Sequence, residues 1–258
     1  MDVTVQTLAL LTLVAFVAGF IDAISGGGGL IAMPSLLLAG LDPLSALATN
    51  KLQGSFGTAS AAYTFWKKGL LHPRHHIPTI LVVFLASALG VATVAYAPKD
   101  FLSLAMPPLL ILIALYFAFA PKLSDNPSKP KLAFGVFTFA FAPIIGFYDG
   151  IFGPGTGSFL MVTLVALFGL GLVEATGRTK LFNVTSNIAA LLMFALAGKI
   201  MWPIGLCMGI AQLIGAQIGA RVAIRNGAKI IRPLLVLVCI AMAIKLLLDP
   251  TNPIRSLF

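Results

Sequence analysis

Long, nearly continuous runs of hydrophobic residues, separated by short polar stretches, make up most of the chain. An α-helix rises about 1.5 Å per residue, so a run of some 20 residues crosses the roughly 30 Å hydrocarbon layer of a bilayer. The runs are continuous rather than alternating, which excludes a transmembrane β-barrel. The pattern predicts spanning helices over Leu44–Trp66, Ile77–Ala97, Phe101–Ala120, Val173–Ala197, Trp202–Ile224 and Ile230–Leu248.

Two further hydrophobic segments, Val5–Gly40 and Leu132–Leu170, are interrupted by glycines. Each is too long for one span and short for two, so a tight hairpin and a re-entrant pair both fit the pattern. Irregular backbone at membrane depth is tolerated only where it lines a cavity enclosed by protein. A duplicated interruption of this kind is therefore a pointer to a transport site.

The chain contains an internal repeat. Asp22 aligns with Asp149 at a shift of 127 residues, and after a two-residue insertion Lys51 aligns with Lys180 at a shift of 129. We therefore expect an N-terminal repeat (1–120), a polar linker (121–131) and a C-terminal repeat (132–258) that form one transmembrane domain. Other matched positions are Gly19 with Gly146, Phe20 with Phe147, Gly26 with Gly153, Gly28 with Gly155, Gly69 with Gly198, and Gly90 with Gly219.

Composition and charge place the protein in a membrane and orient it there. Hydrophobic residues make up 59% of the chain and charged residues only 10%, and the mean hydropathy is +1.02. We expect the net charge of +9 to lie in loops that set topology, rather than to bind nucleic acid. The basic clusters are Lys67, Lys68 and Arg74; Lys122, Lys129 and Lys131; and Arg221, Arg225, Lys229 and Arg232.

Placing all three clusters in the cytoplasm satisfies the positive-inside rule and puts the basic loop at different positions in the two halves. That difference is what inverted copies require. We therefore predict an all-α polytopic membrane protein of two inverted-topology repeats, each a glycine-broken helical hairpin plus three transmembrane helices. We expect it to cross the membrane several times, with a cytoplasmic linker and both termini facing outward.

Five ionisable residues lie inside predicted helices near the interruptions: Asp22, Lys51, Asp149, Arg178 and Lys180. A charge at the bilayer centre costs at least about 2.5–3.5 kcal/mol, so such residues are expected to face a cavity. The alternative is a purely structural role, in which these residues form two salt bridges, one within each half. The many uncharged polar neighbours of the two lysines favour a site instead.

Three cations against two carboxylates favour an anionic ligand. Helices that begin near Leu30 and Phe159 would also aim free N–H groups at the glycine loops. Sequence patterning therefore predicts a site for a small anionic solute without metal or cofactor. The expected substrate-binding residues are Lys51, Lys180, Asn50, Gln53, Ser25, Gly26, Gly27, Gly28, Gly153, Gly155, Thr156, Asn183 and Asn187.

Coupling or charge pairing is expected of Asp22, Asp149 and Arg178. The two carboxylates have two open roles: each pairs with a lysine, or one takes up a proton in the low dielectric and couples proton flow to transport. No metal site is expected, because the three histidines fall in one loop and the two cysteines lie inside apolar helices without ligand spacing.

Four motifs carry a resemblance to a known family. They are Gly19-Phe20-Ile21-Asp22 with the following glycines, Ala48-Thr49-Asn50-Lys51-Leu52-Gln53, Gly146-Phe147-Tyr148-Asp149-Gly150-x-Phe152-Gly153-Pro154-Gly155, and Lys180-Leu181-x-Asn183-x-Thr185-Ser186-Asn187. With them the chain resembles, over nearly its whole length, the TauE/SafE family of sulfite exporter-like or sulfonate permease-like transporters, and its YfcA-like branch in particular. The resemblance implies a secondary carrier of a small, sulfur-containing anion such as sulfite or a sulfonate in the cell inner membrane, which would make both termini periplasmic.

Two rival functions are weighed against this carrier. A passive anion channel would use the same site without concentrating its solute. An intramembrane aspartyl protease needs two membrane aspartates that share a proton, whereas lysines beside Asp22 and Asp149 would keep both ionised. We therefore do not expect an enzyme. Whether the chain forms a homo-oligomer is left open.

Overall fold

The computed structural model describes residues 4–97 and 126–227, which form helices and contain no strand. The first half comprises α1 (Val5–Ser25), α2 (Gly28–Leu38), α3 (Pro43–Lys67), the 3₁₀ helix η1 (Pro73–His76) and α4 (Ile77–Ala95). The second comprises α6 (Phe134–Val136), the π-helical turn η2 (Phe137–Phe141), α7 (Ala142–Ile151), α8 (Thr156–Ala166), α9 (Leu172–Leu196) and α10 (Trp202–Asn226). The spans expected over Phe101–Ala120 and Ile230–Leu248 lie outside the described residues.

Five helical stretches in the described ranges are long and apolar enough to cross a membrane, which confirms a polytopic helical membrane protein. They are Val5–Ser25, Pro73–Val94, Phe134–Ile151, Leu172–Leu196 and Trp202–Asn226. Helix α3 has the same 25-residue length as α9 but a lower hydrophobicity. Its buried side chains include Thr49, Asn50, Lys51 and Gln53. These polar side chains lie inside the bundle and do not contact lipid.

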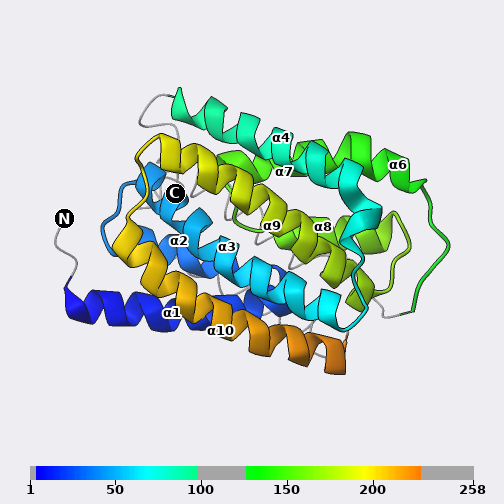
Figure 1. Cartoon of the computed structure of the whole chain (residues 1–258), viewed down its shortest axis with the longest axis horizontal. Coiled ribbons are helices and arrows are strands. Elements are labelled where there is room, and N and C mark those ends of the chain that lie inside the picture. Colours follow the sequence, from blue (N-terminus) through cyan, green and yellow to red (C-terminus); the bar gives the residue numbers. More distant parts are fainter. Residues whose placement is uncertain (1–3, 98–125, 228–258) are drawn as a thin grey trace, which may run out of the picture.

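The two glycine-broken segments each consist of a longer helical stretch followed by a half-length helix. Helices α2 and α8 have 11 residues each, which corresponds to about 16 Å, half of the hydrocarbon layer. The turn after α1 uses Gly26 at a φ of 80°, and α8 follows Gly155 at a φ of 85°, a left-handed backbone that favours glycine. In Figure 1 the chain turns back at each break, so that α3 starts at the end where α1 starts. This is the course of a re-entrant pair.

Helices of one half pack mainly on helices of the other half. Helix α1 packs against α10, and α4 against α7, while α3 and α9 lie together in the middle. Glycines bring the backbones into contact: Gly219 of α10 meets the carbonyl of Phe20, and Gly90 of α4 meets the carbonyl of Phe147. These two contacts join repeat-equivalent positions. Close small-residue packing is how membrane helices gain van der Waals energy without a hydrophobic driving force.

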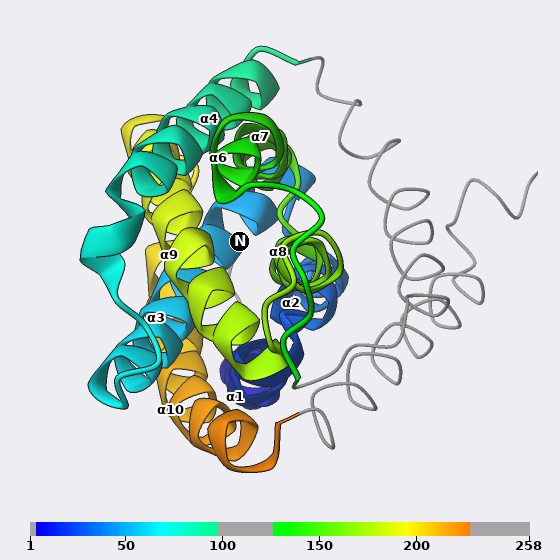
Figure 2. The same cartoon turned by 90° about the vertical axis from the view of Figure 1, so that its right-hand side faces the viewer.

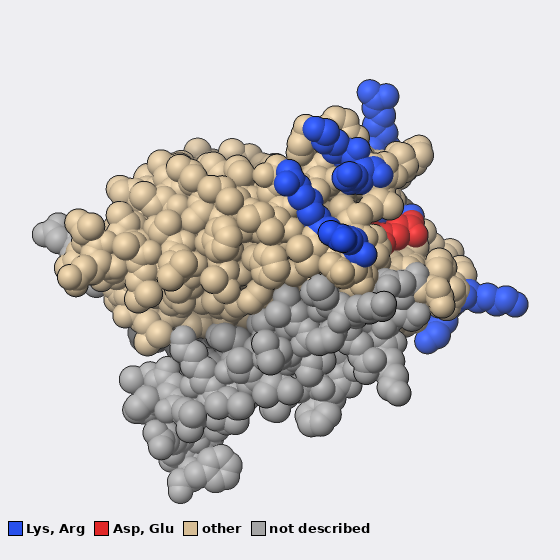
Figure 3. All heavy atoms as spheres, turned by 90° about the horizontal axis from the view of Figure 1, so that it is seen from below, with Lys and Arg blue, Asp and Glu red and all other residues tan. Residues whose placement is uncertain are grey.

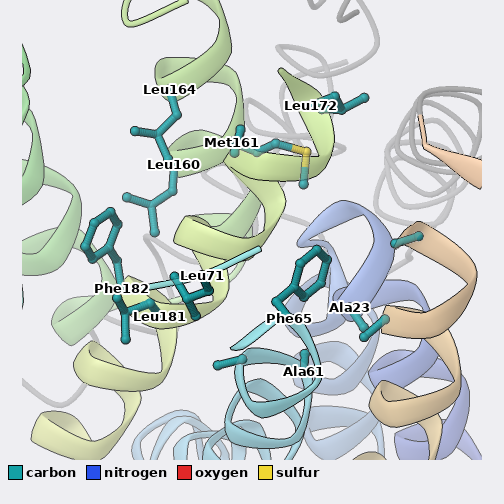
Figure 4. Close-up of a cluster of buried hydrophobic side chains, with 14 of the residues drawn as sticks. Ala23, Ala61, Phe65, Leu71, Leu160, Met161, Leu164, Leu172, Leu181 and Phe182 are labelled. Atoms are coloured by element: carbon teal, nitrogen blue, oxygen red, sulfur yellow. The ribbon is translucent and has the colours of Figure 1, made fainter. Parts of the chain in front are cut away.

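Two buried apolar clusters lie toward opposite ends of the bundle. The first includes Phe65 of α3 and residues of α8, and Figure 4 shows part of it. The second includes Phe194 of α9 and residues of α2. Phe65 and Phe194 are repeat-equivalent, 129 residues apart. In Figure 1, α3 runs from left to right and α9 from right to left, so equivalent helices point in opposite directions.

We predict that Gly90→Ala and Gly219→Ala each destabilise the protein by about 1–3 kcal/mol, because a methyl group must push a helix off a neighbouring carbonyl. Thermal unfolding in detergent measures the effect. Gly135→Ala is the control, because its added carbon meets nothing within 4 Å. Equal melting temperatures for all three variants would contradict this packing.

Candidate functional site

The two half-length helices meet end to end at the centre of the bundle. Figures 1 and 2 together show α2 and α8 running in opposite directions from a shared midpoint. At this midpoint the backbone of Gly26 touches that of Gly157, and a side chain at either position would collide with the other. The Ser158 hydroxyl also donates to the Ser25 carbonyl at 2.8 Å. The N-terminal ends of both helices, with their positive dipole ends, therefore lie at one place.

Two buried ion pairs surround this midpoint, and each joins one half of the chain to the other. Lys51 Nζ lies 2.8 Å from Asp149 Oδ1, and Lys180 Nζ lies 3.0 Å from Asp22 Oδ2. The side chains of both lysines are at most 1% exposed. The alternative of one salt bridge within each half is therefore wrong: the pairs cross, and they tie α3 to α7 and α9 to α1.

The two carboxylates differ in how they are satisfied. Asp22 uses both oxygens, since Oδ1 accepts the backbone N–H of Gly28 at 3.1 Å while Lys180 binds Oδ2. Lys180 also donates to the Asp22 carbonyl. Asp149 Oδ1 accepts from Lys51 and from the Thr156 hydroxyl at 2.7 Å, whereas its buried Oδ2 has no hydrogen-bond partner among the described residues. Among the described residues, Asp149 is thus the carboxylate that can still accept a hydrogen bond or a proton at its second oxygen.

A small polar cavity of about 30 Å³ lies between the ion pairs and the helix ends. A cavity needs about 10–15 Å³ on this measure to hold one water molecule, so this one has room for a very small polar group. The lining residues are Asp22, Gly26, Gly29, Asn50, Lys51, Gly54, Thr58, Asp149, Gly153, Gly155, Gly157, Asn183, Asn187 and Gln212.

Two of the carboxamides that line the cavity, Asn50 and Asn183, have their acceptor oxygens occupied, whereas the buried Gln212 Oε1 has no hydrogen-bond partner among the described residues. Gln53 Nε2 donates to Asn50 Oδ1 at 2.9 Å, and Asn187 Nδ2 donates to Asn183 Oδ1 at 3.3 Å. An amide whose oxygen is already bonded has its NH₂ group left to offer. Asn50 and Asn183 therefore present donors, which suit a ligand with acceptor oxygens.

Most of the residues expected from the sequence lie at or directly behind this cavity. Nine line it: Asp22, Gly26, Asn50, Lys51, Asp149, Gly153, Gly155, Asn183 and Asn187. Others support the lining through the contacts described above: Ser25, Gly28, Gln53, Thr156 and Lys180. Gly27 is the residue before α2 and completes the turn.

Arg178 is not part of the site, which corrects the expected excess of three cations over two carboxylates. Its guanidinium pairs with Glu174 at 2.5 Å, one helical turn earlier, and lies over the ring of Phe134. Two residues separate Arg178 from Lys180, a rotation of about 200° around α9, so the two side chains leave opposite faces. The site therefore has two ammonium groups and two carboxylates, and Lys180 lies behind the lining to which Lys51, Asp22 and Asp149 belong. Across residues 4–97 and 126–227, no His, Cys, Asp and Glu side chains form a group that could hold a metal ion.

Five lining residues are absent from the substrate-binding residues expected from the sequence: Gly29, Gly54, Thr58, Gly157 and Gln212. The repeat carries a signal for three of them, because Gly29, Gly54 and Thr58 are equivalent to Thr156, Asn183 and Asn187. Gln212 is not marked by the repeat, and its signal is a polar side chain in a largely apolar segment. Its side chain fills space that exists only because residues 19 and 57 are glycines, and a methyl group at either would collide with it.

We predict that replacing one member of either ion pair by Ala destabilises the protein by about 3–5 kcal/mol, because the remaining buried charge loses its partner. Removing both partners of a cross-half pair, as in Asp22→Ala with Lys180→Ala, restores part of that loss. Thermal unfolding of the single and double variants measures this coupling. The control pairs Asp22→Ala with Lys51→Ala, for which we expect no recovery. Recovery in the control instead would show pairing within each half.

Comparison with known proteins shows the family to which the chain is similar. Residues 11–246 match the family model described as "Sulfite exporter TauE/SafE". The chain is 47% identical over 254 residues to a "Probable membrane transporter protein ORF9" of Sinorhizobium sp, covering 98% of this chain and 97% of the relative. It is 42% identical over 242 residues to "Probable membrane transporter protein YfcA" of Escherichia coli K12, covering 94% and 90%. A "Probable membrane transporter protein" of Haemophilus influenzae is 41% identical over 249 residues, covering 96% and 98%.

No solved structure matches the chain. The family description and the names of these relatives indicate a membrane transporter rather than an enzyme, and a transporter acts on a small solute. The described residues include five helical stretches that are long and apolar enough to cross a membrane, as a membrane transporter requires. This multi-pass helical membrane protein therefore belongs to the TauE/SafE family of membrane transporters.

Proposed function

We propose that the protein is a secondary carrier for a small anion, which binds at the central cavity. The observation that carries this proposal is the convergence of two helix N-termini, α2 and α8, on a cavity that Lys51 also lines. Helix N-termini attract anions through free N–H groups and the helix dipole. Amide donors from Asn50 and Asn183 complete a donor-rich lining.

The balanced charges of the site suggest how protons enter the cycle. With both ion pairs intact, the four groups sum to zero and an anion finds no net positive charge. A proton on Asp149 would neutralise the carboxylate, release Lys51 and leave one positive charge to hold the anion. Anion and proton would then move together, so transport of a monovalent anion is electroneutral.

Asp149 is the better of the two candidates for this proton. It lines the cavity beside Lys51, and one of its oxygens has no partner within 4–97 and 126–227. Asp22 is bonded at both oxygens, and its partner Lys180 is fully buried behind it. We assign Asp22 and Lys180 to holding α1 against α9.

Alternating access requires the cavity to open toward one side at a time. The two apolar clusters flank it along the helix axes: in α3 one contains Leu47 and the other Phe65, with Lys51 and Thr58 between them. We propose that these clusters are the two gates, and that the halves are inverted-topology repeats (1–120 and 132–258) joined by a cytoplasmic linker (121–131). The opposite directions of α3 and α9 support the inversion (Figure 1).

The membrane orientation follows from the basic residues. Lys and Arg gather toward one end of the face seen in Figure 3, and we place that end in the cytoplasm of the inner membrane. Both termini would then be periplasmic.

A sulfur oxyanion such as sulfite or a sulfonate is the proposed solute. The family description names sulfite, and such an anion offers several acceptor oxygens to the donors around the cavity. A passive anion channel is the second candidate. The apolar clusters on both sides of the cavity favour a carrier over an open pore. A shared-proton aspartate dyad is disfavoured, because each carboxylate is paired with a lysine.

Ligand binding should depend on Lys51. We expect sulfite, a sulfonate or thiosulfate to raise the free energy of unfolding of the purified protein by about 2.7 kcal/mol at a hundredfold excess over its dissociation constant, and so to raise its melting temperature. Lys51→Ala should abolish this rise. Lys199→Ala is the matched control, because Lys199 is exposed in a loop and lines no part of the cavity. Stabilisation that survives in Lys51→Ala would reject the site.

Proton coupling should depend on Asp149. In proteoliposomes, an inward proton gradient should drive uptake of the anion against its own gradient, which a channel does not do. Asp149→Asn should lose this concentrative uptake while it still exchanges internal for external anion, because its neutral side chain mimics the protonated state. Asp22→Asn should keep the pH dependence in whatever flux remains. If Asp149→Asn still concentrates the anion, the assignment fails.

A further inference from the structure

A second, larger pocket lies between α3 and α10, away from the central cavity. Its volume is about 540 Å³. Four of its eight lining residues are cations, two from the end of each helix. The lining residues are Tyr63, Thr64, Lys67, Lys68, Gln217, Arg221, Ile224 and Arg225.

This basic pocket and the central cavity share no lining residue. Lys67 follows Thr58 by nine residues, and Arg221 follows Gln212 by nine residues. Nine residues are two and a half helical turns, so Lys67 and Arg221 each leave their helix about 180° away from that cavity-lining residue. We therefore treat the pocket as a site separate from the proposed transport site.

The pocket has a strong positive charge that nothing described neutralises. No ion pair within 4–97 and 126–227 involves any of its four cations. The side chains of Lys67, Lys68, Arg221 and Arg225 are exposed at the helix ends. A cluster of this kind holds a phosphate well, because Arg offers paired N–H donors and Lys a mobile point charge.

Apolar residues continue the pocket toward the bilayer. Ile214 is 47% exposed and lies two turns before Arg221 on the same face of α10. Tyr63 is 50% exposed and lies one turn before Lys67 on α3. Trp66, at the same end, is 54% exposed, as is usual for a residue at the interface of membrane and water. Cations at the boundary above an exposed apolar face match a phospholipid, with its headgroup at the cations and its chains along the helices.

We propose that the pocket between α3 and α10 binds the phosphate headgroup of an anionic phospholipid at the membrane boundary. Phosphate is the chemistry that the four cations recognise, and a lipid is favoured over free phosphate by the exposed apolar face below them. A lipid held there would bridge the first half of the chain, through α3, to the second half, through α10.

The test measures lipid binding to the purified full-length protein in detergent. Phosphatidylglycerol or cardiolipin should raise the melting temperature, and zwitterionic phosphatidylcholine at the same concentration should not. The double variant Lys67→Gln with Arg221→Gln should weaken apparent affinity roughly 25-fold, from about fivefold for each charge removed. High salt should weaken binding to the natural protein as well.

Two controls keep the proposal open to rejection. Arg74→Gln removes a charge outside the pocket, and it should keep the full lipid effect. Arg221→Lys keeps the charge, so it should retain most of the binding. That result would show that the Gln variants lose binding through the missing charge and not through misfolding. An equal loss in Arg74→Gln, or equal stabilisation by phosphatidylcholine, would overturn the site. Inorganic phosphate that stabilises as well as the lipid at equal concentration would overturn the lipid assignment in favour of a soluble anion.

Discussion

Two lysine–carboxylate pairs buried in the middle of a membrane bundle constrain the whole structure. An unpaired charge in that environment is costly, so each lysine has to reach a carboxylate. The partners stand on opposite halves of the chain: Lys51 reaches Asp149, and Lys180 reaches Asp22. The crossing holds α3 against α7 and α9 against α1. The half-length helices α2 and α8 begin at these pairs, so that polar groups rather than lipid surround the N–H groups of their first turns.

Duplication supplies a symmetric frame, and a few substitutions make it chemically asymmetric. In the first half a backbone N–H, that of Gly28, satisfies the second oxygen of Asp22. In the second half Thr156, at the position equivalent to Gly29, binds the same oxygen of Asp149 that Lys51 binds. Among the described residues, the other oxygen of Asp149 has no hydrogen-bond partner. The two carboxylates thus differ in their surroundings although their positions are equivalent, and the proposed division into a holding pair and a proton-exchanging pair rests on this difference.

The same division applies to the surfaces of α3 and α10. Their inner faces carry the polar residues of the cavity, and the opposite faces carry the cations of the basic pocket. A helix whose two sides serve separate sites explains the low hydrophobicity of α3 compared with the apolar α1 and α4. It also explains why α3, although the sequence predicts a span over Leu44–Trp66, is not among the five stretches of the described residues that are long and apolar enough to cross a membrane.

The sequence by itself determined the helical class, the repeat, both interruptions and most of the residues around the cavity, because hydrophobic run length, glycine spacing and charges in apolar segments are local properties. It did not determine the partner of each charge. Pairing across the halves, the separate position of Arg178 and the closing of Gln212 over two glycines depend on which helix faces meet. Only the tertiary structure decided those contacts, since the energy of a buried charge or a close backbone contact is set by neighbours more than a hundred residues away along the chain.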